Sequence, residues 1–326
     1  MKKLFTPKFT TYDGKPTLLV ATGGTIGSML GGADGTKGYI RSLNETQGNE
    51  INDPSVSKID QDDFLLAALY NQVYSDRKRQ FTVQTPFTKF SENLNIELME
   101  GLINYALQCL SQDEFVGMII THGSDTKMFT SAILSRLAKQ GVLNVPFEVV
   151  HSMYPIPPES KDLPAWDGFK NFSSAVNSID NTSPMPIKNA YKEYIKLHDN
   201  SMILSASPGL SFKNFRVDEK IKNLIIQGYH SCTAPVGALK DLIDIWNGNI
   251  YIVSPEEFSA PYDSITELLD YTEKKPDVDI HFTTDTPINV WAAATLGRNK
   301  DITNSVSSNR LGTLKSFQFN FKNKIR

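Results

Sequence analysis

Two glycine-containing turns carry the side chains in this sequence that could do chemistry. The first is the turn Thr22–Thr25 (TGGT), which directly follows the apolar run Leu18–Ala21. Its two glycines allow the backbone to turn sharply and to approach a ligand closely. A threonine hydroxyl on such a turn, among free backbone N–H groups, could act as a nucleophile beside an oxyanion site. A tight strand-to-loop turn without any chemistry also explains these residues, because glycine-rich turns after strands are common.

The second turn, 121–126 (THGSDT), repeats this arrangement after the apolar run 115–120. A helix is expected from this turn to about residue 140, so Ser124 and Asp125 would lie at its N-terminus. The dipole and free N–H groups of a helix N-terminus favour anions. Helix capping alone would also account for a Ser-Asp pair at this place. For His122 a structural role is expected, and not that of a metal ligand.

Two other segments add candidate side chains. Tyr39 follows the glycine-rich stretch 28–38, which reads as a mobile loop, and it could either close over a ligand or simply anchor that loop. Ser91 and Glu92 lie between a predicted strand at 81–86 and a predicted helix at 96–110. Ser91 could serve as an N-cap of this helix instead of binding a ligand.

The elements that must position these side chains form an α/β pattern. The runs 18–21 and 115–120 lack polar alternation, which is typical of strands buried on both faces of a parallel sheet, and residues 146–150 are predicted to form a third strand. In open parallel sheets, ligands bind at the carboxyl ends of the strands. We therefore predict a larger doubly wound, mostly parallel N-terminal sheet domain that carries the site, and a smaller C-terminal α/β domain.

The predicted domain bounds follow from a break in this pattern. Residues 1–180 form the catalytic domain, residues 181–200 a linker, and residues 201–326 the smaller domain. Within the smaller domain the sequence predicts strands, helices and one edge strand, in this order: strand 202–206, helices 217–227 and 236–246, strand 250–253, helices 265–271 and 288–296, and edge strand 317–321.

Composition excludes several functional classes. The chain has 326 residues, 40% of them hydrophobic and 21% charged, with a net charge of −3. This balance gives no electrostatic case for nucleic acid or an anionic membrane. No stretch approaches the roughly 20 apolar residues of a membrane span, and the N-terminus lacks the apolar core of a signal peptide. The two cysteines, Cys109 and Cys232, read as reduced and buried, which predicts a cytoplasmic protein.

Known cofactor and metal motifs are missing from the sequence. It contains no Cys/His cluster at metal-ligand spacing, no Walker-type phosphate loop, no Gly-x-Ser-x-Gly elbow and no dinucleotide fingerprint in register. We expect neither a cofactor nor a metal.

Taken in order, five segments resemble the bacterial-type L-asparaginase family, which also includes glutaminase-asparaginases. They are Thr22–Ile26, Gly38-Tyr39, residues 91–95, residues 121–126 with one change, and Asp167-Gly168 ahead of a helix that contains Asn171. The resemblance covers residues 17–179 well and residues 202–297 more faintly. It implies a hydrolase that converts L-asparagine, with L-glutamine as an open second substrate, to the acid and ammonia.

The resemblance also implies roles for individual residues. Thr25 would be the nucleophile, assisted by Tyr39, and backbone N–H groups would stabilise the acyl-enzyme. The Ser124 hydroxyl would stand in for the family's second catalytic threonine and help to activate water. Asp125 would complete the catalytic set.

Substrate binding is implied for a second group of residues. Glu92, together with Asp125, would hold the α-ammonium of the amino-acid amide, and Ser91 would hold its α-carboxylate. Gly24 and Gly123 would contact the substrate within the two turns. The family's sites are completed between subunits, so the resemblance further implies a homodimer or homotetramer.

Two departures from the family pattern stand out. Serine at position 124 keeps the hydroxyl and loses the methyl group that restricts its rotamer. The family's catalytic lysine follows a strand and hairpin for which this chain has only about twenty residues, and none of Lys188, Lys192 and Lys196 sits in a matching motif. The alternative prediction is therefore a degenerate family member that binds an amino acid or a protein partner without efficient turnover.

Overall fold

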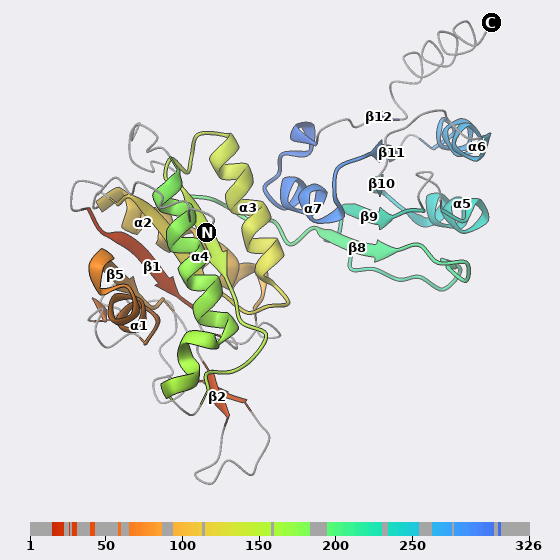
Figure 1. The fold of residues 1–326 in the computed structure, drawn as a ribbon. Coiled ribbons are helices and arrows are strands. Elements are labelled where there is room, and N and C mark those ends of the chain that lie inside the picture. Colours follow the sequence, from red (N-terminus) through yellow and green to blue (C-terminus); the bar gives the residue numbers. More distant parts are fainter. Residues whose placement is uncertain are drawn as a thin grey trace, which may run out of the picture. The chain divides into compact units, whose positions relative to one another are not determined.

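The chain forms two compact units, Met1–Ile195 and Lys196–Arg326, each described here by itself (Figure 1). The computed structural model describes residues 15–22, 26, 28–30, 40–42, 58–59, 65–86, 94–112, 115–157, 160–182, 194–229, 234–253, 263–275, 277–302 and 306–307.

A five-stranded sheet forms the centre of the first unit. Its strands lie in the order β4 (Lys58–Ile59), β5 (Phe81–Gln84), β1 (Thr17–Ala21), β6 (Gly117–Thr121) and β7 (Phe147–Val150). All neighbours from β5 to β7 pair in parallel, and only the edge strand β4 runs antiparallel. The side chains of β1 and of β6 are buried on both faces, as expected for the interior of a parallel sheet.

Helices cover this sheet. They are α1 (Leu65–Val73), α2 (Ile96–Gln112), α3 (Lys127–Lys139) and α4 (Asp167–Asn181), with short 3-10 turns at Ser75–Arg77 and Ser160–Ala165. Apolar side chains of α1 and α4 pack with Leu19 and Ile119 into one core on one face of the sheet. The strands that follow β1 in sequence are added first on one side of it, as β4 and β5, and then on its other side, as β6 and β7. The carboxyl ends of β1 and β6 therefore flank a topological switch point, the usual place for a ligand in such sheets.

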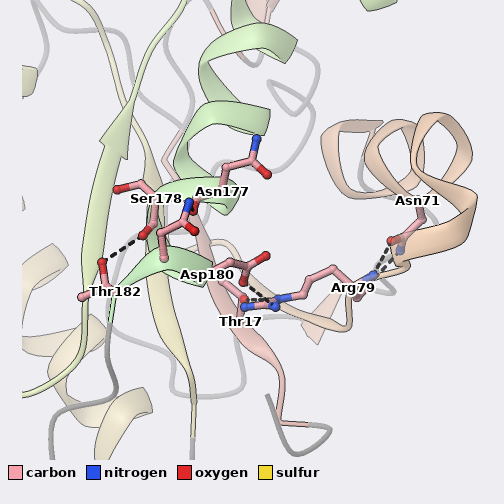
Figure 2. Close-up of polar contacts among 8 residues, drawn as sticks. Thr17, Asn71, Arg79, Asn177, Ser178, Asp180 and Thr182 are labelled. Carbon is pink, nitrogen blue, oxygen red and sulfur yellow. Dashed lines mark hydrogen bonds and ion pairs between the residues drawn. The ribbon is translucent and has the colours of Figure 1, made fainter. Parts of the chain in front are cut away.

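The amino-terminal edge of this sheet is held by a buried ion pair (Figure 2). Arg79 Nη1 lies 2.6 Å from Asp180 Oδ1 in the last turn of α4. Arg79 Nε–H also donates to Thr17 Oγ1 at 3.0 Å. The Asn71 side chain makes two hydrogen bonds with the Arg79 backbone. Arg79 N–H donates to Asn71 Oδ1 at 2.7 Å, and Asn71 Nδ2–H donates to the Arg79 carbonyl at 3.0 Å. One guanidinium thus joins β1, α4 and the connection from α1 to β5.

The second unit repeats the α/β pattern with another five-stranded sheet. Its strands lie in the order β12 (Val306–Ser307), β11 (Val278–Thr283), β10 (Gly248–Val253), β9 (Asn223–Gln227) and β8 (Ser201–Ser205). Strands β8 to β11 pair in parallel, and β12 runs antiparallel to β11. Helices α5 (Val236–Ile245), α6 (Asp263–Thr272) and α7 (Pro287–Thr295) belong to this unit. The predicted fold class, a larger doubly wound domain and a smaller α/β domain, is confirmed.

The residues on either side of the division between the units pack firmly. Ile195 exchanges two hydrogen bonds of 2.8 Å with the Asn104 side chain of α2, N–H to Oδ1 and Nδ2–H to the carbonyl. On the other side of the division, His198 N–H donates to the Thr295 carbonyl at 2.8 Å. Ile195 and His198 are thus each hydrogen-bonded within their own unit.

Two sequence predictions about local structure are wrong, and one strand was not predicted. Residues 223–227 (NLIIQ) form β9 instead of the end of a helix, since a short apolar run buried on both faces has no periodicity that separates strand from helix. Strand β11 was not predicted. Ser28–Leu30 pairs with Ile40–Ser42 as the antiparallel strands β2 and β3, where a mobile loop was expected to begin. The predicted edge strand 317–321 lies outside the described residues.

Candidate active site

One buried hydrogen bond ties the ends of β1 and β6 together at the switch point. Thr22 Oγ1–H donates to the Thr121 carbonyl at 2.6 Å, and both side chains are almost fully buried. Ala21 and Thr121 are paired in the sheet, so β1 and β6 end at the same level. The two turns singled out in the sequence therefore leave adjacent strands at the same edge.

The first turn is also fixed at its far end. Ile26 is 2% exposed and packs in the core beneath α1 and α4. Its neighbour in sequence, Thr25, stands between this apolar anchor and the buried Thr22. The chain is thus pinned on both sides of Gly23, Gly24 and Thr25, which themselves lie outside the described residues.

His122 supports the second turn. Its Nδ1–H contacts the Gly123 carbonyl at 3.0 Å, and its Nε2 contacts Thr130 Oγ1 of α3 at 2.9 Å. Burial lowers the pKa of His122, which favours the neutral ring. A neutral imidazole with both nitrogens engaged in this way fixes the Gly123 carbonyl, in agreement with the structural role expected for His122.

Ser124 and Asp125 lie in the turn that leads into α3. Lys127 N–H donates to the Gly123 carbonyl at 3.1 Å, so this turn already has helical form. Ser124 Oγ–H donates to Asp125 Oδ1 at 3.1 Å, and the Asp125 side chain is exposed. A carboxylate in the first turn is favoured by the helix dipole. The half-buried Ser124 and the exposed Asp125 carboxylate thus lie together in the turn that leads into α3.

A basic pair adjoins this turn. Lys127, the first residue of α3, donates from Nζ to Nδ1 of His151 at 3.1 Å. His151 directly follows β7, and its carbonyl accepts a 2.9 Å hydrogen bond from Asn171 Nδ2. Burial lowers the pKa of His151, the Lys127 ammonium lowers it further, and the Asp167 carboxylate opposes both. The ring is therefore held neutral, with Nδ1 as the acceptor.

The segment after β7 is anchored by the first residue of α4. Asp167 accepts from Ser152 Oγ–H and from Met153 N–H, both at 2.7 Å. Trp166 Nε1–H donates to the Tyr154 carbonyl at 2.9 Å. The Asp-Gly-x-x-Asn segment that opens α4 thus holds the chain that follows β7 at the carboxyl edge of the sheet.

The structure describes only some of the predicted site residues. Gly123, Ser124 and Asp125 are brought together beside the end of β1. The other predicted residues lie outside the described part of the chain: Gly24, Thr25, Tyr39, Ser91 and Glu92. A few residues after Ser91 and Glu92 in the sequence, Asn95 Oδ1 accepts a hydrogen bond from Leu98 N–H at 2.9 Å. Asn95 is therefore the N-cap of α2 within the described residues.

Comparisons with known proteins agree with this geometry. The family model described as "Asparaginase, N-terminal" matches residues 17–186, a span that includes both turns and α4. The chain belongs to the asparaginase family. No curated protein matches the sequence significantly.

Solved structures of L-asparaginases have the same fold. The thermostable L-asparaginase from Thermococcus kodakarensis superposes with a TM-score of 0.59 at 15% identity, covering 88% of this chain and 94% of that one. The probable cytoplasmic L-asparaginase from Campylobacter jejuni gives a TM-score of 0.52 at 15% identity, covering 88% and 95%. At this identity the likeness concerns the fold, and it extends over both units.

Sequence reasoning did not single out Lys127, His151 and Ser152, which the structure places at the start of α3 and directly after β7. A signal for each was present. His151 and Ser152 are polar residues directly after the predicted strand 146–150, at the edge where ligands bind. Lys127 places a cation in the first turn of a helix, where the dipole disfavours it.

Two other features are absent from the described residues. No three His, Cys, Asp or Glu side chains in this part of the chain gather into a group that could hold a metal ion. Among the helices that the structure describes, none is long and apolar enough to cross a bilayer.

Replacing Gly168 by alanine is expected to disturb the segment after β7. A Cβ at this position would lie 2.4 Å from the Trp166 ring, which must move and give up its bond to Tyr154. Overpacking of this kind costs about 1–3 kcal/mol of unfolding free energy, measurable by urea denaturation. The matched control is Gly237→Ala, because the space around Gly237 in α5 is open and alanine is the better helix former. Equal stability of Gly168→Ala and the parent protein would contradict the packing described.

Proposed function

We propose that the protein is an amidohydrolase that converts L-asparagine to L-aspartate and ammonia through an acyl-enzyme on Thr25. The observation that carries the proposal is the bond between Thr22 Oγ1 and the Thr121 carbonyl, which fastens the two family turns side by side at the switch point. The family match over residues 17–186 supports the reaction class. L-Glutamine, with one more methylene, is the second candidate substrate.

The residue roles follow the chemistry of amide hydrolysis. The Thr25 hydroxyl, assisted by Tyr39, would attack the side-chain amide and release ammonia. Backbone N–H groups of the turns at Gly24 and Gly123 would stabilise the oxyanion. Ser124 would then help to deliver water to the acyl-enzyme.

Substrate recognition requires groups for a zwitterion. The exposed Asp125 carboxylate, with Glu92, suits an α-ammonium group, and Ser91 suits an α-carboxylate. These charges favour a free amino-acid amide over a peptide with blocked ends, and we place the reaction in the cytoplasm. A homodimer or homotetramer that completes the site remains part of the proposal.

The direct test is ammonia release by the purified full-length protein from L-asparagine, L-glutamine and N-acetyl-L-asparagine. We expect steady ammonia release from L-asparagine and slower or equal release from L-glutamine. We expect no ammonia from N-acetyl-L-asparagine, because this compound lacks the α-ammonium group. Release from the acetylated compound at the same rate would contradict the assigned ammonium site. Absence of release from all three would contradict the hydrolase.

A second candidate is a family member that binds an amino acid or a protein partner without turnover. One observation favours it, because no lysine has been located that could replace the family's catalytic lysine. Lys196, the described lysine of the segment after α4, is exposed and is the first residue of the second unit. Lys188 and Lys192 lie outside the described residues. A rise in melting temperature with L-asparagine or L-glutamine, without ammonia release, would favour this candidate.

Ser124→Thr is expected to keep or raise kcat for L-asparagine. Threonine retains the hydroxyl, and its extra methyl group restricts χ1, which reduces the freedom of the catalytic oxygen. The control is Ser124→Ala, which removes the hydroxyl and should lower kcat by roughly 100-fold, the usual worth of a proton-transferring group. Complete loss of activity in Ser124→Thr would show that the site is built around serine alone.

A further inference from the structure

His122 is a buried polar side chain beside the site, and the proposed function gives it no part in the reaction. It is 2% exposed. Its Nδ1 lies 3.0 Å from the Gly123 carbonyl oxygen, and its Nε2 lies 2.9 Å from Thr130 Oγ1 of α3. A carbonyl oxygen can only accept, so the proton of the neutral ring is on Nδ1 and the Thr130 hydroxyl donates to Nε2. These contacts therefore define one tautomer of His122.

The surroundings of the ring keep it in this neutral form. Burial lowers the pKa of His122. The bond to the Gly123 carbonyl raises this pKa, and the neighbouring His151 and Lys127 lower it again. The imidazole thus holds a single proton, which it donates to the Gly123 carbonyl.

The Gly123 carbonyl also has a second donor. Lys127 N–H donates to it at 3.1 Å, in the first bond of helical form at the start of α3. The imidazole is therefore not needed to satisfy this carbonyl. Two donors from different directions fix the plane of a peptide group, which a single donor leaves free to tilt. The bond from His122 thus restrains the orientation of the peptide between Gly123 and Ser124.

This orientation decides where the Ser124 N–H points. The peptide bond between Gly123 and Ser124 is trans, as are the other peptide bonds of the described residues. In a planar trans peptide the C=O and N–H groups point in opposite directions. The Gly123 carbonyl points into α3, to Lys127 N–H. The Ser124 N–H therefore points out of the start of this helix, at the carboxyl edge of the sheet where ligands bind.

The backbone ahead of this peptide is held as well. The Thr121 carbonyl accepts from Thr22 Oγ1–H at 2.6 Å, and His122 N–H donates to the Val150 carbonyl at 2.8 Å. The neighbouring chain segments at β1 and β7 thus fix residues 121 and 122. The His122 ring extends this restraint to the next peptide group, the one that carries the Ser124 N–H.

We propose that His122 is a positioning residue for amide hydrolysis, whose Nδ1–H holds the Gly123–Ser124 peptide with the Ser124 N–H toward the substrate oxyanion. The inference rests on the proposed function, in which backbone N–H groups of the two turns stabilise the oxyanion. His122 acts through the backbone, and no proton leaves its ring. Its loss should raise the energy of the transition state more than that of bound substrate, because the negative charge on the amide oxygen develops only there.

Three variants separate this positioning from stability. His122→Leu removes the donor and should lower kcat for L-asparagine by roughly 100-fold with little change in KM, the cost of misplacing a group in the site by about 1 Å. His122→Asn keeps an N–H group at the place of Nδ1 and should restore most of kcat. The control is Thr130→Val, which leaves Nε2 without its donor but keeps the Nδ1–H bond. It should lower the melting temperature and keep the kcat of the parent protein.

The kinetic outcomes divide clearly. A folded His122→Leu with the kcat of the parent protein would overturn the positioning role and leave the hydrolase intact. A loss of kcat in Thr130→Val as large as that in His122→Leu would also overturn it, because lost stability would then explain both. Equally low kcat in His122→Asn and His122→Leu would show that the donated hydrogen bond is not the cause. An inactive parent protein would overturn the proposed function, and the catalytic role of His122 with it.

The tautomer is tested without turnover by nitrogen NMR of the imidazole at neutral pH. The signals of His122 are assigned by their absence in His122→Asn. We expect a protonated Nδ1 and an unprotonated Nε2. A proton on Nε2 would overturn the proposal, and this result does not depend on whether His122→Leu folds.

Discussion

Replacing Arg79 by methionine is expected to lower the free energy of unfolding of the first unit by about 3 kcal/mol, the usual cost of breaking a buried ion pair from one side. The side chains of Arg79 and Asp180 are each only 14% exposed, and their charged atoms are 2.6 Å apart. Without the guanidinium, the Asp180 carboxylate stays buried near the C-terminus of α4, where the dipole also disfavours it. Thr17 loses its hydrogen-bond donor as well (Figure 2).

The control is the double variant Arg79→Met with Asp180→Leu. It removes both charges, so no buried carboxylate remains without the Arg79 guanidinium, and the apolar side chains can fill the space. Its stability in urea should exceed that of the single variant Arg79→Met, as is seen when buried pairs are replaced together. Equal instability of the single and double variants would show that Arg79 acts by packing and not by neutralising Asp180.

The same carboxylate gives the Arg79→Met variant a defined pH dependence. Burial raises the pKa of Asp180, and Arg79 counteracts this. A carboxyl group with a higher pKa in the folded state binds its proton more tightly there than in the unfolded chain. The free energy of unfolding of the protein therefore falls as the pH rises and this proton is lost. Removing Arg79 raises this pKa further. The stability gap between variant and parent should therefore be smaller at pH 4 than at pH 7, and a gap that widens on acidification would contradict the assignment.

The buried strands of the first unit could be predicted from the sequence because their physical signal is local. Leu18–Ala21 and 115–120 are short, wholly apolar and followed by glycine-containing turns, which fits β1 and β6. The same reasoning failed at β9, where Leu224, Ile225 and Ile226 are equally apolar but follow a segment with helical spacing. Pairing with β8 and β10 decides the strand, and that information lies far away in the sequence.

The candidate site shows a similar division. Motifs predicted the two turns, and the hydrogen bond from Thr22 to Thr121 gives them a shared location. The contact of Lys127 with His151 joins residues on α3 and after β7, and no motif spacing indicates it. Asp167 was noted only as part of a motif, and its bonds to Ser152 and Met153 became apparent from the packing of α4. The assignments at Thr25, Tyr39, Ser91 and Glu92 stay predictions.

Replacing Thr25 by alanine is expected to have the largest effect on catalysis. Loss of a nucleophile typically lowers kcat by roughly 1,000-fold or more, because the covalent route no longer exists. The change adds no volume, and the anchors on either side, Thr22 and Ile26, remain in place. The melting temperature of Thr25→Ala should therefore match that of the parent protein. Thr25→Ser keeps the hydroxyl with a freer rotamer and should retain part of the activity.

The role of Thr25 is best tested by the rate of ammonia release from L-asparagine, measured side by side for the parent protein, Thr25→Ala and Thr25→Ser. The account predicts release by the parent, partial release by Thr25→Ser and none above background by a folded Thr25→Ala. Release by Thr25→Ala at the rate of the parent protein would contradict the claim that Thr25 is the nucleophile.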